Sequence, residues 1–210
     1  MKRLLVYCEG PTEESFIKAV LAPYLQNKNI NALPVGAGGV SKYSIIKKEL
    51  TRLCKTDSQA IVTTMLDYYG LPGNTPGIGT TSGSPFDKAR HIESSVEDDI
   101  GKLPNLLFNL VVHEFEGLLF ANTEAFANFA DTKQLAALAK IKSNFDTPEH
   151  INNSYDTSPS RRIVSIIPNY AKVRDGTVIA KRIGIDGISA ECKHFAAWMS
   201  KIISLATHPS

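Results

Sequence analysis

The stretch 4-LLVYCEGPTEESF-16 decides the fold, because it joins an apolar segment directly to the start of a helix. Residues 3–8 form a short apolar run that predicts a buried strand. Pro11 suits the first turn of a helix, and the acidic Glu13 complements the positive end of the helix dipole. Glu9 lies at the junction, where an acid at the rim of a buried strand costs stability unless its charge is used. We therefore expect Glu9 to have a function.

Further apolar segments alternate with helical patterns along the first half of the chain. We predict strands at 3–8, 30–35, 60–69 and 105–116, and helices from 11 to about 24, at 41–54 and at 86–101. This alternation indicates a Rossmann-like α/β fold with a parallel sheet flanked by helices. The residues after the last strand are mostly helical in pattern, with a final amphipathic helix near 188–205. We predict an α/β core at 1–130 and a helical C-terminal extension at 131–210 that packs on the core.

Composition limits the class of protein. The chain has 210 residues, 43% of them hydrophobic, and a formal net charge of +2, so it lacks an overall basic field that would attract a polyanion. Its three cysteines are widely spaced, without a CxxC pair, which argues against a disulfide framework or a structural zinc site. The apolar N-terminal run is too short for a signal peptide, and no apolar run is long enough to span a membrane. We expect a cytoplasmic protein with no membrane partner.

Acidic residues follow three of the predicted strands. Glu9 ends the first strand, Asp67 ends the third, and Glu114 and Glu116 end the fourth. Because open α/β sheets place their sites outside the carboxyl ends of the strands, these carboxylates converge if the strands are parallel neighbours. Carboxylates brought together repel, and a divalent cation relieves that repulsion. The oxygen ligands favour Mg²⁺ or Mn²⁺ over zinc.

The same residues also have structural interpretations. Glu9 and Asp67 are compatible with solvated positions at a turn or strand end. Glu114 and Glu116 alternate along a strand, so only one of them need face a site. The segment HEFEG lacks the second histidine of the zinc-protease motif HExxH and has a strand pattern, so we reject a zinc site there. His113 is either a structural histidine or a hydrogen-bond donor or proton shuttle.

Basic residues in the C-terminal half are candidates for phosphate binding. In 158-SPSRRI-163, Ser160 is predicted to cap a helix whose first turn holds Arg161 and Arg162. Arginine is unfavourable at a helix N-terminus, and its guanidinium binds phosphate with two hydrogen bonds. A phosphate clamp and a solvated surface both remain open. Further basic residues that could follow a phosphate backbone are Lys172, Arg174, Lys181 and Arg182.

The segments VYCEGPTEESF and TTMLDYYGLPG together resemble the Toprim signature, in the E-G-x-T-E form of OLD-type nucleases. With HEFEGLLF and SPSRRI, they resemble a bacterial domain-of-unknown-function family with a Toprim-like fold, often encoded beside an AAA/ABC-type ATPase. The resemblance extends from Leu4 to about Ile163. It implies a compact parallel sheet, a divalent metal, and cleavage or transfer of nucleic-acid strands.

The resemblance also implies roles for individual residues. Glu9 corresponds to the metal ligand or general acid/base that follows the first strand, and Glu13 to the second acid of the OLD-like form. The third-strand D-x-D pattern falls on Asp67-Tyr68-Tyr69, where Tyr69 replaces the second acid. Glu114 or Glu116 would have to supply the missing carboxylate. Tyr68 and Tyr69 are expected to be packing or stacking residues.

The residues and the resemblance together lead to three functional hypotheses. The first is a Mg²⁺- or Mn²⁺-dependent nuclease, for which the resemblance implies bacterial defence or repair and an ATPase partner. In it, Glu9, Asp67 and Glu114 or Glu116 hold the metal, and an arginine of the 161–162 pair offsets charge on the phosphate. The second is a non-catalytic adaptor that docks onto an ATPase. The third is phosphotransfer with Asp67 as acceptor. It is disfavoured because Glu9 has no evident acidic partner at the end of the first strand. Formation of a homo-oligomer stays open.

Overall fold

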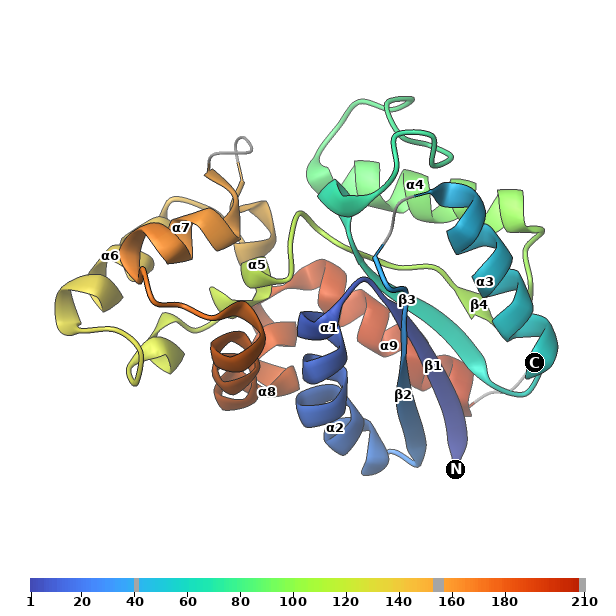
Figure 1. The fold of residues 1–210 in the computed structure, drawn as a ribbon, viewed down its shortest axis with the longest axis horizontal. Coiled ribbons are helices and arrows are strands. Elements are labelled where there is room, and N and C mark those ends of the chain that lie inside the picture. Colours follow the sequence, from blue (N-terminus) through green and yellow to red (C-terminus); the bar gives the residue numbers. More distant parts are fainter. Residues whose placement is uncertain (40–41, 153–156, 208–210) are drawn as a thin grey trace.

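The computed structural model describes residues 1–39, 42–152 and 157–207, and its centre is a parallel β-sheet (Figure 1). The strands are β1 (Lys2–Cys8), β2 (Ile30–Gly36), β3 (Ile61–Asp67), β4 (Leu106–Leu107) and β5 (Leu110–Val111). Their order is β2-β1-β3-β4, with β5 also paired to β3, and every pairing is parallel. The predicted parallel α/β fold is confirmed.

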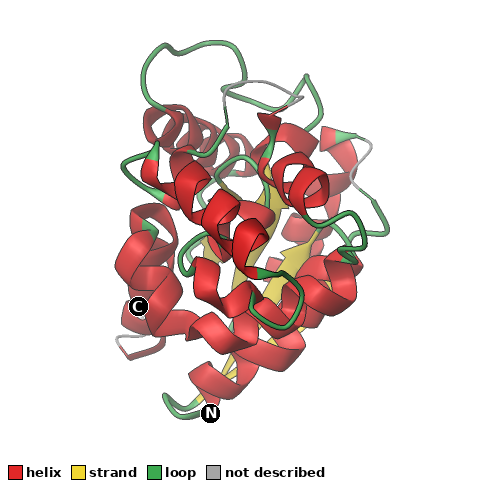
Figure 2. Cartoon of the chain, turned by 90° about the vertical axis from the view of Figure 1, so that its left-hand side faces the viewer, coloured by secondary structure: helices red, strands yellow, loops and turns green. Residues whose placement is uncertain are grey.

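Helices cover both faces of the sheet (Figure 2). One face packs against α3 (Tyr43–Thr56) and α4 (Pro85–Ile100). The other packs against the N-terminal helical segments and the last two helices, which are α1 (Pro11–Phe16), the π-helical Ile17–Leu21, α2 (Ala22–Gln26), α8 (Thr177–Glu191) and α9 (Lys193–Thr207). Strand β1 contributes to both cores, because Val6 and Tyr7 point to opposite faces. This double burial explains why its sequence is almost continuously apolar.

Shorter helical elements lie beside the sheet, to the left in Figure 1. They are α5 (Glu116–Leu119), the 3₁₀ turn Thr123–Phe126, α6 (Thr132–Ser143), the 3₁₀ turn Pro148–His150, α7 (Pro159–Ile166) and the π-helical turn Lys172–Gly176. The core on the α8 and α9 side of the sheet extends from Leu4 in β1 through Leu138 in α6 to Ile202 in α9. The predicted helical C-terminal region is therefore present, and α8 and α9 form a layer on the sheet. The boundary at residue 130 stays a prediction.

Two helix boundaries differ from the prediction. The N-terminal helix was predicted to end near residue 24, and it continues to Gln26, with a π-helical segment just before Pro23. The backbone is helical on both sides of Pro23, so the chain passes through this proline without a new helix start. The helix predicted at 188–205 is two helices that meet at Cys192, whose backbone is extended. Ser41, where the predicted helix 41–54 would begin, lies outside the described residues.

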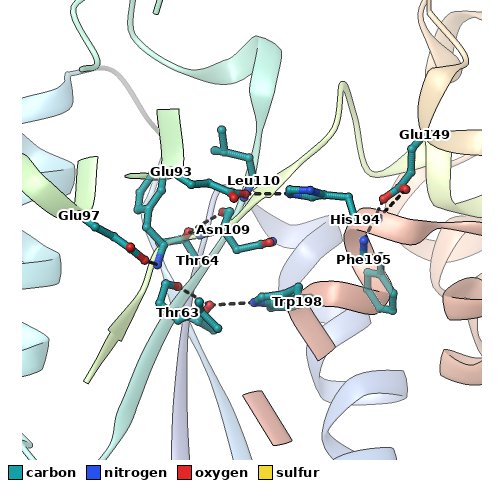
Figure 3. A network of polar contacts seen from close by, with 12 residues as sticks. Thr63, Thr64, Glu93, Glu97, Asn109, Leu110, Glu149, His194, Phe195 and Trp198 are labelled. Carbon is teal, nitrogen blue, oxygen red and sulfur yellow. Dashed lines mark hydrogen bonds and ion pairs between the residues drawn. The ribbon is translucent and has the colours of Figure 1, made fainter. Parts of the chain in front are cut away.

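The fourth strand is not continuous from 105 to 116, as predicted, but is broken between β4 and β5. The backbone N–H of Phe108 donates to Glu97 Oε1 at 2.9 Å, and that of Asn109 donates to Thr64 Oγ1 at 2.8 Å. The N–H of Leu110 donates to Glu93 Oε1, also at 2.9 Å. These donors bond side chains instead of the carbonyl groups of β3, so the ladder is interrupted. Figure 3 shows these contacts.

Further buried contacts, which share Glu93 with those above, hold α9 against the sheet (Figure 3). His194 Nε2 lies 2.8 Å from Glu93 Oε1, and the indole of Trp198 donates to Thr63 Oγ1 at 2.9 Å. Glu149 accepts the backbone N–H groups of His194 and Phe195, at 2.9 and 3.0 Å, at the start of α9. We call Glu93, Glu97, Glu149 and their partners the buried polar network. Its carboxylates are satisfied by donors of the protein itself.

The described residues include all three cysteines, which are buried free thiols. No helix among these residues is both long and apolar enough to cross a membrane.

Candidate functional site

The structure brings Glu9 and Asp67 to one edge of the sheet. Cys8, the last residue of β1, pairs with Met65 of the parallel neighbour β3, so Glu9 and Asp67 follow at the same end. The loop after β5 reaches this edge because Asp67 pairs with Val111. A cavity of about 370 Å³ lies here, and its lining includes Glu9, Asp67, Glu114 and Lys172. We call it the acid cavity.

Glu114 and Glu116 do not alternate along a strand, so the prediction about their placement is wrong. Strand β5 ends at Val111, which leaves Glu114 in a loop, and Glu116 is the first residue of α5. Glu114 lines the acid cavity, and its Oε2 accepts the N–H of Ser160 at 3.0 Å. Glu116 is only 1% exposed and forms an ion pair with Lys172 at 3.3 Å. Because the strand breaks early, both acids reach the same region.

Backbone contacts fix the orientation of the other acids. Asp67 Oδ1 accepts the N–H of Phe115 at 3.1 Å, which holds the loop after β5 over the end of β3. Glu13 Oε2 accepts the N–H of Gly10 at 3.0 Å, so Glu13 points back toward the junction after β1. Together with Glu9, Glu114 and Glu116, these residues form what we call the acid cluster.

A glycine lies directly against Glu9. A Cβ atom placed on Gly70 would be 2.5 Å from Glu9 Oε2, so a side chain at position 70 would require the Glu9 carboxylate to move. The Glu9 carboxylate therefore occupies the space that a side chain at Gly70 would need.

Burial and mutual repulsion disfavour the charged forms of the acids. Burial raises the pKa of Asp67 well above its usual value, and the nearby carboxylates of Glu13 and Glu9 raise it further. Burial also raises the pKa of Glu13 to about 7, and the pKa values of Glu9 and Glu116 rise for the same reason. Perturbed acids grouped at a cavity mark a candidate functional site.

Lys172 is the cation of the site, and the sequence did not single it out for this role. Although burial opposes its charge, the carboxylates of Glu116 and Glu114 raise the pKa of Lys172. It begins a π-helical turn just before α8, and only the folded chain brings it beside Glu116. A lone lysine in a basic region carries no local signal of such a contact.

The acid cluster has features that suit a hard divalent cation. Glu9 Oε2 is buried without a hydrogen-bond partner. Among the described residues, no group of three or more acidic, histidine or cysteine side chains is arranged so that it could hold a metal ion. Mg²⁺ does not need such a group, since one or two carboxylates with waters and a substrate phosphate complete its shell. Glu9 and Asp67 are the residues best placed to hold it, with Glu114 beside them.

Arg161 and Arg162 do not line the acid cavity. They line a separate cavity of about 460 Å³ along α6 and α7. Arg162 Nε donates to the carbonyl of Thr157 at 2.6 Å, and its guanidinium lies 5.6 Å from the centre of the Phe145 ring. The helix cap is Ser158, not Ser160 as predicted. The charge opposite the acids is instead that of Lys172, while a role for the arginines in catalysis stays a prediction.

Tyr69 lies between the acid cavity and a neighbouring cavity. Its ring stacks on His113, with 5.2 Å between ring centres and 13° between planes. His113 adopts a left-handed backbone conformation, with φ of 67°. Burial lowers the pKa of His113 to about 4, so its imidazole is neutral at physiological pH.

The fold and the site define a class: an α/β protein whose parallel sheet carries a group of buried acids at the carboxyl ends of its strands. The chain belongs to the family described as Domain of unknown function (DUF4276), whose model matches residues 8–203. It is similar to the C-terminal region of the Burkholderia pseudomallei OLD protein, with 12% identity and a TM-score of 0.48, over 95% of this chain and 98% of that chain. No curated protein matches the chain.

Proposed function

We propose that this protein is a phosphodiesterase dependent on Mg²⁺ or Mn²⁺ that cleaves nucleic acid. The observation that carries the proposal is the acid cavity, where Glu9, Asp67 and Glu114 face the same space as Lys172. Carboxylates hold a divalent cation, and a lysine beside them attracts a phosphate group. Acids without a ligand-binding function would be costly in this arrangement.

Each residue has a role in this proposal. Glu9 and Asp67 would hold the cation, with Glu114 beside them, and the cation would polarise a phosphoryl oxygen and activate a water when bound. Lys172 offsets charge on the phosphate, and its ion pair with Glu116 orients it. Glu13, with a pKa of about 7, exchanges a proton readily at neutral pH and is the candidate general acid or base.

The substrate and the biological setting rest on the resemblance to Toprim-like and OLD-type proteins. That resemblance supports DNA or RNA as the substrate, bacterial defence or repair as the process, and an AAA/ABC-type ATPase as the partner.

A non-catalytic adaptor is the second candidate. Two observations favour it: Tyr69 replaces the second acid of the D-x-D pattern, and no three-ligand group exists among the described residues. In this case the same fold would dock onto an ATPase, and the acids would hold a structural cation or none.

A cleavage assay with matched variants separates the two candidates. The purified protein is incubated with supercoiled plasmid or single-stranded RNA in Mg²⁺ or Mn²⁺, beside Glu9→Gln, Asp67→Asn and the exposed control Glu124→Gln. We expect wild type and the control to cleave, and the two site variants to lose at least about a hundredfold in rate, as when a charge-stabilising group is removed from an active site. Calorimetric titration with Mn²⁺ should show weaker binding to both site variants. Equal background in all four proteins, alone and with the ATPase partner, would favour the adaptor.

A further inference from the structure

A second cavity adjoins the acid cavity and has a different chemistry. Its volume is about 370 Å³, and it shares Tyr69 and Asn152 with the acid cavity. The rest of its described lining is aromatic, aliphatic or basic, namely Tyr68, Pro85, Lys88, Val112 and His113. None of these residues is acidic. We call this space the aromatic cavity.

Tyr69 forms a supported aromatic surface between the two cavities. Its ring stacks on His113, and the ring of Tyr68 packs at a right angle to it, with ring centres 5.4 Å apart and planes at 89°. Tyr69 nevertheless remains 57% exposed. A large exposed ring that is held in place by its neighbours is preorganised to stack with a planar ligand.

His113, which supports Tyr69, is held at a cost to the fold. It is 6% exposed, and neither of its ring nitrogens has a hydrogen-bond partner. Its left-handed backbone conformation, with φ of 67°, is uncommon for a residue other than glycine. Unsatisfied buried polar atoms and backbone strain both destabilise a protein, and both cluster at ligand sites. His113 therefore has a strained backbone, supports the ring of Tyr69 and lines the aromatic cavity.

We propose that the aromatic cavity binds an unpaired nucleobase whose adjoining phosphate lies in the acid cavity. This inference rests on the proposed function and names its substrate class: single-stranded nucleic acid, or a nucleotide turned out of a duplex. The base stacks on Tyr69 and extends the His113–Tyr69 stack. Lys88 lies where it attracts the backbone of the same nucleotide. A paired base cannot reach Tyr69, because its faces are covered by the bases above and below it.

Binding without turnover tests the proposal. Fluorescence anisotropy is measured in EDTA and in Ca²⁺ with labelled oligonucleotides of one length: single-stranded DNA, single-stranded RNA, duplex DNA and an abasic DNA strand. The proteins are wild type, Tyr69→Phe, Tyr69→Ala and a control, Ile45→Ala, in which an exposed apolar side chain on α3 is shortened. The DNA and RNA strands identify the preferred sugar.

We expect wild type, Tyr69→Phe and the control to bind a single strand more tightly than the duplex or the abasic strand. Tyr69→Ala should weaken single-strand binding about 5- to 150-fold, the loss of one base-stacking contact, and change abasic binding little. Equal binding of wild type to all four oligonucleotides, or unchanged single-strand binding by Tyr69→Ala, would overturn the proposal.

The result is separable from the cleavage assay. Single-strand binding that depends on Tyr69, in a protein that never cleaves, would keep the base site and reject the nuclease. Duplex cleavage with binding unaffected by Tyr69→Ala would keep the nuclease and reject the base site.

Discussion

The acid cluster and the buried polar network both contain buried carboxylates, and the groups that surround those carboxylates differ. In the network, Glu149 accepts two backbone N–H groups and Glu93 accepts one, with His194 beside it. In the acid cluster, Asp67 is surrounded by other carboxylates that raise its pKa, and Glu9 Oε2 has no partner. The comparison teaches that acids satisfied by the protein itself hold the fold together. Acids that raise one another's pKa at a cavity are, on the proposed function, the ones that bind a ligand.

The largest expected effect is on the free energy of unfolding, when one acid is replaced in the buried polar network and one in the acid cluster. Glu149→Ala leaves the N–H groups of His194 and Phe195 buried without an acceptor, which should cost about 2–4 kcal/mol in the free energy of unfolding. Asp67→Asn retains Oδ1 for the N–H of Phe115 but removes the repelled charge, which should stabilise the metal-free protein by about 0.5–2 kcal/mol. Urea unfolding in EDTA measures both.

Glu149→Gln is the matched control for the network, because it keeps one acceptor oxygen and should lose less stability than Glu149→Ala. Equal destabilisation by Asp67→Asn and Glu149→Ala would contradict the conclusion that the network acids stabilise the fold and the cluster acids do not.

A smaller effect is expected in the dependence of stability on pH. The pKa of Glu13 is about 7 in the folded protein, against an ordinary value of 4.5. Between these values the folded state keeps a proton that the unfolded chain has released, so Glu13 stabilises most below about pH 4.5 and this contribution is lost as the pH rises through 7. Measured from pH 4.5 to 8 in EDTA, the stability of Glu13→Gln should fall less steeply than that of wild type. Parallel curves would mean that Glu13 titrates normally.

The smallest and most local effect is expected at Gly70. A methyl group added by Gly70→Ala would displace the Glu9 carboxylate, because the new Cβ would lie 2.5 Å from Glu9 Oε2. We expect about tenfold weaker Mn²⁺ binding, comparable to the loss of a residue that positions a metal ligand, with little change in unfolding. Gly73→Ala is the matched control, since a Cβ there has no heavy atom within 4 Å. Equal Mn²⁺ affinity in the two variants would show that the position of Glu9 does not matter.

Local patterns predicted the parts of the fold that depend on local chemistry. The apolar run of β1 and the acid-terminated run of β3 indicated parallel strands, and their pairing brings Glu9 to the same edge as Asp67. The fourth strand was predicted too long because its N–H groups bond distant acceptors, including Glu93 on α4. Nothing in the apolar run itself reveals those acceptors.

The cation of the site was missed for a similar reason. Lys172 lies far from Glu116 in sequence, and only the packing of the turn before α8 joins them. Arg161 and Arg162 were the more obvious candidates, because arginines at a helix start are unusual. The packing of α7 places them along a different cavity. A basic residue at an acid site is therefore identified by tertiary contacts and not by its local motif.

The parallel sheet has a consequence for the order of events during protein synthesis. Strand β1 pairs with strands that are made after it, and the groups of the acid cavity come from Glu9, Asp67, Glu114 and finally Lys172. Until Lys172 has been synthesised, the growing chain contains the repelling carboxylates but lacks the lysine that pairs with Glu116. On the proposed function, the growing chain therefore stays incomplete as a nuclease until the turn before α8 has left the ribosome, and unfinished fragments lack the assembled site.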